Sequence, residues 1–246
     1  MEHGVRHIPI LIFFLWGLMS CAPIYVPTAH NIPMFSGKGE FQGSVGAGLG
    51  FNLQTAYAVS DHMAFSANYL YAKDEQQEHG RRHQAGEIAL GYYTNFNERW
   101  CFEVFAGYGM GKGNAYDSAY SLENPFLVLP LFSNDRYEAI GTFNKIYIQP
   151  SIGLKQNDFT WSISAKLSYV NATEINISRN DERWWNGKTS KVFFSWVGDG
   201  QAPLLKKKIF LHYQVGLNVP FGDDPIFDYE PFMCSIGMLI KLNSKK

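Results

Sequence analysis

The stretch Phe159-Thr160-Trp161-Ser162-Ile163-Ser164-Ala165-Lys166-Leu167-Ser168-Tyr169 has the most regular pattern in the chain. Every odd-numbered residue in it is apolar or aromatic, and every even-numbered residue is polar. Successive side chains of a β-strand point to opposite faces, so this alternation predicts a strand with one apolar and one polar face.

The same alternation, in less regular form, predicts nine further strands and no helix. They cover residues 41–49, 53–60, 63–72, 87–96, 102–109, 146–155, 192–196, 209–219 and 232–242. Most of these strands are close to the ~9–11 residues that a tilted strand needs to cross a bilayer.

The connections between the strands alternate in length. One set is short (60–62, 97–99, 156–158 and 198–201), and the other is mostly long and polar (73–83, 111–144, 172–190 and 220–231), with a tight turn only at 50–52. Outer-membrane barrels have short periplasmic turns and long extracellular loops. The sequence therefore predicts an all-β, closed antiparallel up-and-down transmembrane barrel of ten strands, with eight as the alternative count. With ten strands, the first and the last strand both have their free termini on the periplasmic side.

The composition of the 246 residues is charge-poor, at 17 % charged and 16 % aromatic residues, with a net charge of -1. A near-neutral chain lacks the basic surface that nucleic acid requires, so we expect no nucleic-acid partner. The mean hydropathy of -0.17 and the absence of an 18-residue apolar run exclude a helical membrane protein. Strands with one apolar and one polar face explain a mean hydropathy near zero.

Residues 8–18 form an apolar run that is too short to span a bilayer and has the length of a signal-peptide core. The run ends in Leu18-Met19-Ser20-Cys21, which resembles the bacterial lipoprotein signal, in which cleavage leaves an acylated cysteine at the new N-terminus. We expect residues 1–20 to be a cleaved signal peptide and Cys21 to be lipidated, in agreement with a periplasmic start of the barrel and a lipid on the inner leaflet. An ordinary signal peptide with a chance cysteine is the alternative.

Residues 21–39 contain three prolines and two glycines, which favour extended structure, and we expect a tether there. Residues 40–246 would form the barrel. The lipoprotein signal, the tether, Ala56-Tyr57-Ala58-Val59-Ser60-Asp61-His62, Gln149-Pro150-Ser151-Ile152-Gly153 and Ser235-Ile236-Gly237 together resemble the small outer-membrane barrel proteins of Bacteroidota. This resemblance implies a fold and a location in the bacterial outer membrane, anchored through Cys21, and it implies no activity.

Four ionisable side chains are expected to face the lumen by their position in the alternation: Glu87, Glu103, Lys166 and His212. Buried charges are stable only when they are paired or hydrated, so we expect a polar network across the lumen. Such a network would plug a ten-strand barrel, whereas wide aqueous pores belong to barrels of 16 or more strands.

The predicted loop 172–190 contains Arg183-Trp184-Trp185, residue types that often anchor protein contacts, so these three residues are a candidate extracellular contact. We find no motif that indicates a catalytic residue, a metal site or a cofactor. The predicted function is a structural or surface-binding role in the outer membrane, without enzymatic activity. The expected partners are outer-membrane lipid and an extracellular ligand or envelope partner of unknown identity.

Three alternatives to this function stay open: a small-solute pore, a lipid-modifying barrel enzyme, and a soluble periplasm-facing β-sandwich lipoprotein. Three features argue against the sandwich. Aromatic residues lie near the strand ends, the opposite strand faces are rich in Gly, Ser, Ala, Gln and Asn, and the connection 111–144 is long for a compact soluble domain.

Overall fold

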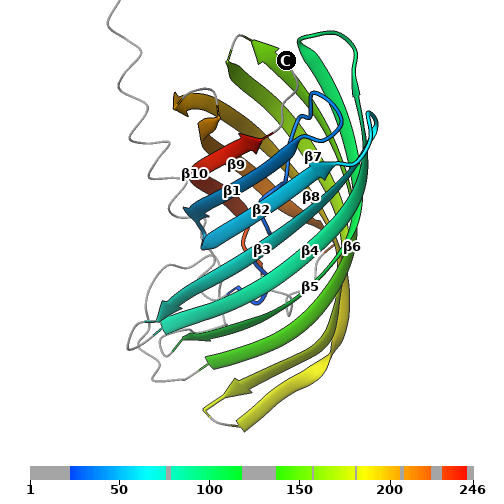
Figure 1. The fold of residues 1–246 in the computed structure, drawn as a ribbon. Coiled ribbons are helices and arrows are strands. Elements are labelled where there is room, and N and C mark those ends of the chain that lie inside the picture. Colours follow the sequence, from blue (N-terminus) through cyan, green and yellow to red (C-terminus); the bar gives the residue numbers. More distant parts are fainter. Residues whose placement is uncertain are drawn as a thin grey trace, which may run out of the picture.

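The computed structural model describes residues 23–75, 79–117, 137–156, 158–180, 182–205, 208–222 and 229–242. These residues form ten strands (Figure 1): β1 (Phe41–Gly48), β2 (Phe51–Ala58), β3 (Met63–Glu75), β4 (His79–Asn95), β5 (Trp100–Asp117), β6 (Tyr137–Gln156), β7 (Phe159–Arg179), β8 (Glu182–Leu205), β9 (Ile209–Phe221) and β10 (Phe232–Leu242). Within the described part of the chain, no helix is long and apolar enough to cross a membrane.

Each strand pairs antiparallel with its neighbours in the sequence, and β1 pairs with β10, so the sheet closes into a barrel. At this closing seam Phe41 lies opposite Leu242, and Gly48 lies opposite Ser235. The prediction of an all-β, closed antiparallel barrel of ten strands is confirmed. The alternative count of eight strands and the alternative β-sandwich are both wrong.

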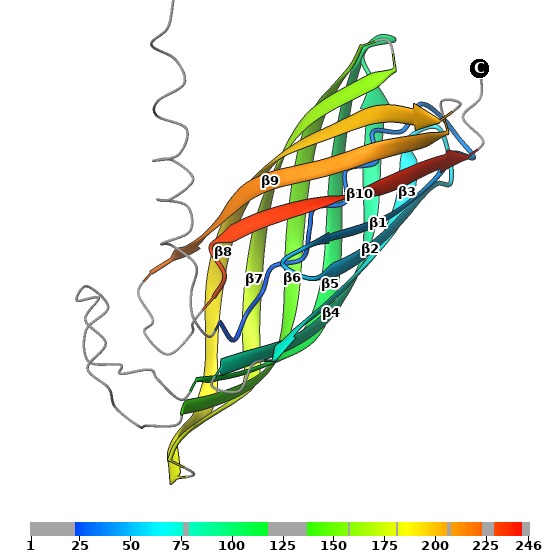
Figure 2. The ribbon, with the colours of Figure 1, turned by 90° about the vertical axis from the view of Figure 1, so that its left-hand side faces the viewer.

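The two ends of the barrel differ. At the end that we call the short-turn end, brief connections join β2 to β3, β4 to β5, β6 to β7 and β8 to β9. At the opposite end, the long-hairpin end, β4 to β8 extend far beyond the other strands, and the β7–β8 hairpin projects furthest (Figure 2).

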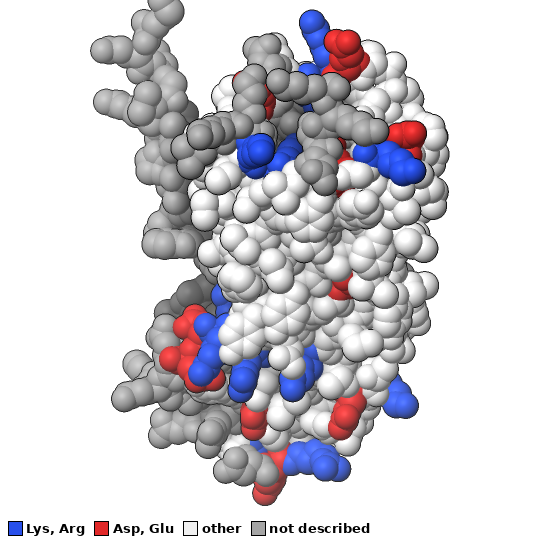
Figure 3. Space-filling view, in the orientation of Figure 1, with Lys and Arg blue, Asp and Glu red and all other residues white. Residues whose placement is uncertain are grey.

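Outward-facing side chains in the middle of the barrel are apolar and exposed. On β7, Ile163 is 63 % exposed and Leu167 is 45 % exposed, whereas the inward-facing Ser164 and Lys166 are 0 % and 3 % exposed. The belt between the two ends carries few charged side chains, which gather instead towards the ends (Figure 3). This distribution reverses that of a water-soluble protein and is typical of a barrel that faces lipid.

The polarity of the two faces inverts towards the long-hairpin end. Beyond Tyr169 of β7, Asn171 and Glu174 face outward, while Ile175 and Ile177 are buried inside. The buried residues of this region form an apolar cluster: Ile24, Tyr25, Val26, Leu70, Ala85, Tyr137, Ala139, Phe143, Val170, Ala172, Ile175, Ile177 and Phe193. This end of the barrel is therefore built like a soluble domain, with apolar residues inside and polar residues outside.

This inversion explains why two predicted loops, 73–83 and 172–190, are mostly strand and why a third, 111–144, is strand at both of its ends. The segment 172–190 forms the facing ends of β7 and β8, joined at residues 180–181. Likewise, β3 continues to Glu75 and β4 begins at His79, and β5 continues to Asp117 before β6 begins at Tyr137. Outward apolar residues mark the belt, and this pattern stops where the strands leave the belt. A register shift between Ala172 and Ile175 interrupts the alternation further.

The segment Pro23–Glu40 departs most from expectation. The sequence predicts a tether over 21–39, but Pro23–Gly39 run lengthwise through the barrel, as the dark blue trace in Figure 2 shows. Ile24 and Tyr25 are buried at the long-hairpin end, where Tyr25 forms a β-bridge with Tyr229. Phe35 is buried at the short-turn end, from which β1 begins. We call Pro23–Glu40 the threaded segment.

Candidate functional site

The backbone of the threaded segment is held by glutamines of the barrel wall. Five buried glutamine amides, which we call the glutamine collar, donate to four consecutive carbonyl oxygens, those of residues 30–33. The bonds are Gln54 and Gln214 to His30 (2.9 and 2.6 Å), Gln149 to Asn31 (2.8 Å), Gln201 to Ile32 (3.3 Å) and Gln42 to Pro33 (2.6 Å). An extended chain has unpaired carbonyls, and the collar supplies the donors that a neighbouring strand would otherwise supply.

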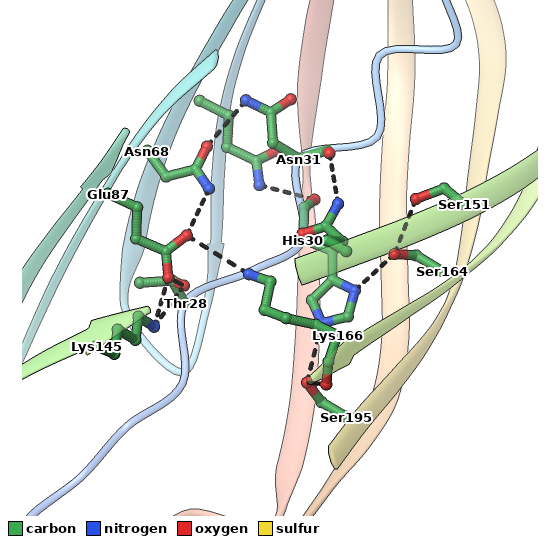
Figure 4. Close-up of polar contacts among 12 residues, drawn as sticks. Thr28, His30, Asn31, Asn68, Glu87, Lys145, Ser151, Ser164, Lys166 and Ser195 are labelled. Carbon is green, nitrogen blue, oxygen red and sulfur yellow. Dashed lines mark hydrogen bonds and ion pairs between the residues drawn. The ribbon is translucent and has the colours of Figure 1, made fainter. Parts of the chain in front are cut away.

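Glu87 of β4 is the centre of an ionic cluster on the long-hairpin side of the collar (Figure 4). Its carboxylate forms ion pairs with Lys145 of β6 and with Lys166 of β7, the latter at 3.4 Å. It also accepts hydrogen bonds from Thr28 of the threaded segment and from Asn68 of β3 at 2.9 Å. All five side chains are buried, so each charge depends on these partners for its stability.

His30 links the threaded segment to two serines of the opposite wall (Figure 4). Its Nδ1 lies 3.0 Å from Ser164 Oγ on β7, and its Nε2 lies 3.2 Å from Ser195 Oγ on β8. Because a hydroxyl can donate or accept, both ring nitrogens are satisfied in the neutral imidazole. Ser164 also accepts a hydrogen bond from Ser151 Oγ at 3.0 Å, so the imidazole is part of a chain of buried hydroxyls.

The short-turn end of the lumen is closed by contacts to Phe35. Its backbone N–H donates to Glu103 Oε1 at 2.9 Å, and its carbonyl accepts from Lys155 Nζ at 2.9 Å. Its ring packs 5.3 Å from the ring of Tyr93. Phe35 is therefore held by three neighbouring strands, β4, β5 and β6, before the chain turns into β1.

His212 of β9 pairs with Asp199 of β8, with 2.5 Å between Nε2 and Oδ2, and Gln214 of the collar also donates to Asp199 at 3.1 Å. Ser162 donates to the other oxygen of Asp199 at 2.9 Å. The carboxylate thus lies between the serine and the histidine. A serine nucleophile requires the histidine itself as its base, so this order is not that of a catalytic triad.

The four lumen residues taken from the sequence do face inward, but the structure distributes them over three groups. Glu87 and Lys166 meet in the ionic cluster, Glu103 binds the backbone of Phe35, and His212 binds Asp199. Among the described residues, Glu87 and Lys166 are the two of the four whose side chains pair with each other.

Several members of these groups were missed by sequence reasoning. Lys145 was missed because the predicted strand began only at residue 146, and Asp199 was missed because it was assigned to a short turn at 198–201. The residues of the threaded segment were missed because the prolines suggested a tether. The signal that could have revealed them is the apolar content of the segment, which includes Ile24, Val26 and Ile32.

The candidate extracellular contact lies on the β7–β8 hairpin at the long-hairpin end. Arg183 and Trp184 are exposed, and Trp184 has 57 % of its surface accessible. Trp185 instead packs against the apolar cluster inside the barrel, so its role is structural. Cys21 lies outside the described residues.

No group of three or more His, Cys, Asp or Glu side chains suited to a metal ion occurs among the described residues. Cys101 is buried and Cys234 is exposed, and both are free thiols. The described lumen is a packed interior that encloses a peptide segment, polar around the collar and the ionic cluster and apolar towards both ends.

Neither a family model nor a curated protein matches the sequence. Among solved structures, the chain is similar to the translocator domain of the autotransporter NalP from Neisseria meningitidis. The TM-score is 0.46 and the sequence identity is 8 %, over 82 % of this chain and 85 % of that chain.

Proposed function

We propose that this chain is an outer-membrane barrel, anchored by a lipid on Cys21, whose lumen is filled by its own N-terminal segment. Its role is structural or surface-binding rather than solute transport or catalysis. The observation that carries the proposal is the combination of an exposed apolar belt with a lumen in which His30, Met34 and Phe35 are each 0 % exposed.

The belt supports residence in a membrane. Ile88, Leu90, Ile148 and Ile163 each expose between 48 % and 64 % of their surface around the barrel. A contiguous apolar surface of this extent is unfavourable in water, and outer-membrane barrels carry such a band between their periplasmic turns and extracellular loops. Because the short turns of such barrels are periplasmic and the long connections are extracellular, the long-hairpin end faces the cell exterior.

The threaded segment supports a closed lumen. Its carbonyls are bound by the glutamine collar, and Thr28 and His30 bind charged or polar side chains of the wall. Displacing the segment would leave these buried groups unpaired, and each such group costs about 1–3 kcal/mol. The small-solute pore is therefore the weaker candidate.

Two observations support a role without catalysis. Ser162 and His212 both bind Asp199 rather than each other, and Ser164, which does contact a histidine, is 0 % exposed. A nucleophile in this position has no access to a lipid substrate. Exposed Arg183 and Trp184 at the outer end support a surface contact instead.

The test of this function is conductance of the purified protein in a planar lipid bilayer. We expect no steady channel from the wild-type protein. A variant that lacks residues 24–35 but retains the barrel spectrum should conduct, because the lumen loses its filling. Steady conductance of the wild-type protein at the level of this deletion variant would contradict the proposal.

A further inference from the structure

The direction in which the threaded segment crosses the barrel determines where its N-terminal side emerges. Ile24 lies at the long-hairpin end, where a Cβ built on Gly141 of β6 would be 2.6 Å from Ile24 Cγ2. Met34 lies at the opposite end, where a Cβ built on Gly153 of β6 would be 2.6 Å from Met34 Sδ. The segment thus follows β6 from its outer part to its periplasmic part.

Ile24 lies beyond the apolar belt. Its neighbour Gly141 precedes Thr142 and Asn144, which face outward on β6, and Gly141 pairs with Gly113 next to the exposed Lys112. On β7, Glu174 is exposed at the same level. On β6 and β7 the continuous run of apolar outward residues begins at Ile146 and Tyr169, and Ile140 is an isolated exposed apolar residue beyond it. The segment therefore enters the lumen on the water side of the belt edge.

The reach of the chain then limits where a lipid on Cys21 can lie. Only Ala22 separates Cys21 from Pro23, and two residues of fully extended chain reach at most about 7 Å. The hydrocarbon core of a bilayer is about 30 Å thick. Acyl chains on Cys21 cannot reach the leaflet at the short-turn end while Ile24 occupies its place at the long-hairpin end.

We propose that the lipid on Cys21 is inserted in the outer leaflet, at the cell-surface end of the barrel, and not in the inner leaflet. This inference rests on the proposed function, since it requires a lipidated Cys21 and a barrel with its long hairpins outside. It replaces the expectation of an inner-leaflet lipid. The threaded segment is then held at one end by acyl chains and at the other by β1.

The network inside the lumen fixes this course. The collar binds the carbonyls of residues 30–33, and Glu87 and Glu103 bind the segment at levels on either side of the collar. Tyr25 also accepts a backbone hydrogen bond from Glu230 at 2.9 Å near the outer end. The segment cannot slide along the barrel axis without breaking all of these contacts at once.

The experiment combines cross-linking and palmitate labelling of the same protein molecules in cells. All variants also carry Cys101→Ala and Cys234→Ala, so that no other described cysteine reacts. The variant Ile24→Cys with Gly141→Cys reports the outer end of the segment, and the matched control Met34→Cys with Gly153→Cys reports the periplasmic end. A short thiol cross-linker is applied after labelling with radioactive palmitate. In a third variant, Arg183→Cys, an impermeant maleimide tests whether the long-hairpin end faces the medium in intact cells.

We expect the cross-linked form of the Ile24/Gly141 pair to carry palmitate, and Arg183→Cys to react in intact cells. If the palmitate-bearing molecules cross-link at the Met34/Gly153 pair but not at the Ile24/Gly141 pair, the outer-leaflet inference is wrong while the lipidated barrel stands. If Arg183→Cys reacts only after permeabilisation, the orientation and hence the leaflet are reversed. If no variant incorporates palmitate, the lipid anchor of the proposed function fails, and this inference fails with it.

Discussion

Glu87 on β4 and Lys166 on β7 form an ion pair across the lumen, with 3.4 Å between Oε2 and Nζ. These strands are not neighbours in the sheet, since β5 and β6 lie between them. The pair therefore ties together parts of the wall that no backbone hydrogen bond joins, and the threaded segment participates through Thr28.

The first prediction concerns Lys166. We expect Lys166→Leu to lower the free energy of unfolding by about 1–3 kcal/mol, because Glu87 loses one buried hydrogen-bond partner while Lys145 still neutralises its charge. Thermal unfolding in detergent, followed by circular dichroism, measures this effect. Lys112→Leu, at an exposed position of β5, serves as the control. An unchanged melting temperature for Lys166→Leu would indicate that this lysine is solvated.

The second prediction concerns the shared carboxylate. Glu87→Gln keeps the shape of the side chain but leaves two buried ammonium groups without their counter-charge, so we expect a loss of about 3–5 kcal/mol. The same unfolding measurement should therefore rank Glu87→Gln as more destabilising than Lys166→Leu. The reverse order would mean that Lys145 and Lys166 find other partners.

The third prediction tests the glutamine collar. The double variant Gln54→Leu and Gln214→Leu removes both donors to the His30 carbonyl and should destabilise the protein by about 1–3 kcal/mol. It should also raise the access of solutes to the lumen, seen as transient current in a planar bilayer. Gln84→Leu, at an outward position on β4, should change neither quantity. If both variants showed the same stability and the same current, the collar would not be what holds the threaded segment in the lumen.

The fourth prediction locates the edge of the belt on one strand. Lysine in place of a lipid-facing residue costs about 2–4 kcal/mol at the middle of the bilayer and little at its interface. We therefore expect Ile163→Lys to destabilise the barrel in lipid vesicles, and Asn176→Lys, further along β7, to be nearly neutral. Similar effects at both positions would show that the polarity inversion does not mark the membrane boundary.

The fifth prediction concerns processing. Cys21→Ala should leave an unprocessed precursor that incorporates no palmitate, because the acylated cysteine is required before cleavage of a lipoprotein signal. Cys234→Ala should be processed and labelled as the wild-type protein. Normal processing of Cys21→Ala would identify an ordinary signal peptide.

Sequence reasoning predicts the wall of this barrel well because each strand has two chemically different environments. The alternation in residues 159–169 reflects lipid on one side of the strand and a polar interior on the other. It predicts the strand number, the closed sheet and three of the four short turns, whereas the turn expected at 198–201 is wrong because these residues lie inside β8. It also identifies Glu87 and Lys166 as inward-facing charges.

The same reasoning does not extend to regions where the environment changes. Beyond Tyr169 the strands leave the belt and their outward side chains become polar. The sequence there is then hard to tell from that of a polar loop. Nor does a period-two pattern predict what fills the interior, because an extended segment rich in proline can be solvated or enclosed. The enclosed state differs from the solvated one in that its carbonyls pair with five glutamines from different strands. These glutamines come together only in the closed barrel.

The position of the threaded segment immediately before β1 constrains the order in which the molecule can assemble. β1 and β10 meet along only eight residue pairs, and this is the seam at which the sheet becomes a ring. The acyl chains that we propose on Cys21 would be too bulky to pass through a finished ring packed with side chains. On that proposal the β1–β10 seam closes around a peptide that already lies in place, so this seam is the last part of the sheet to form.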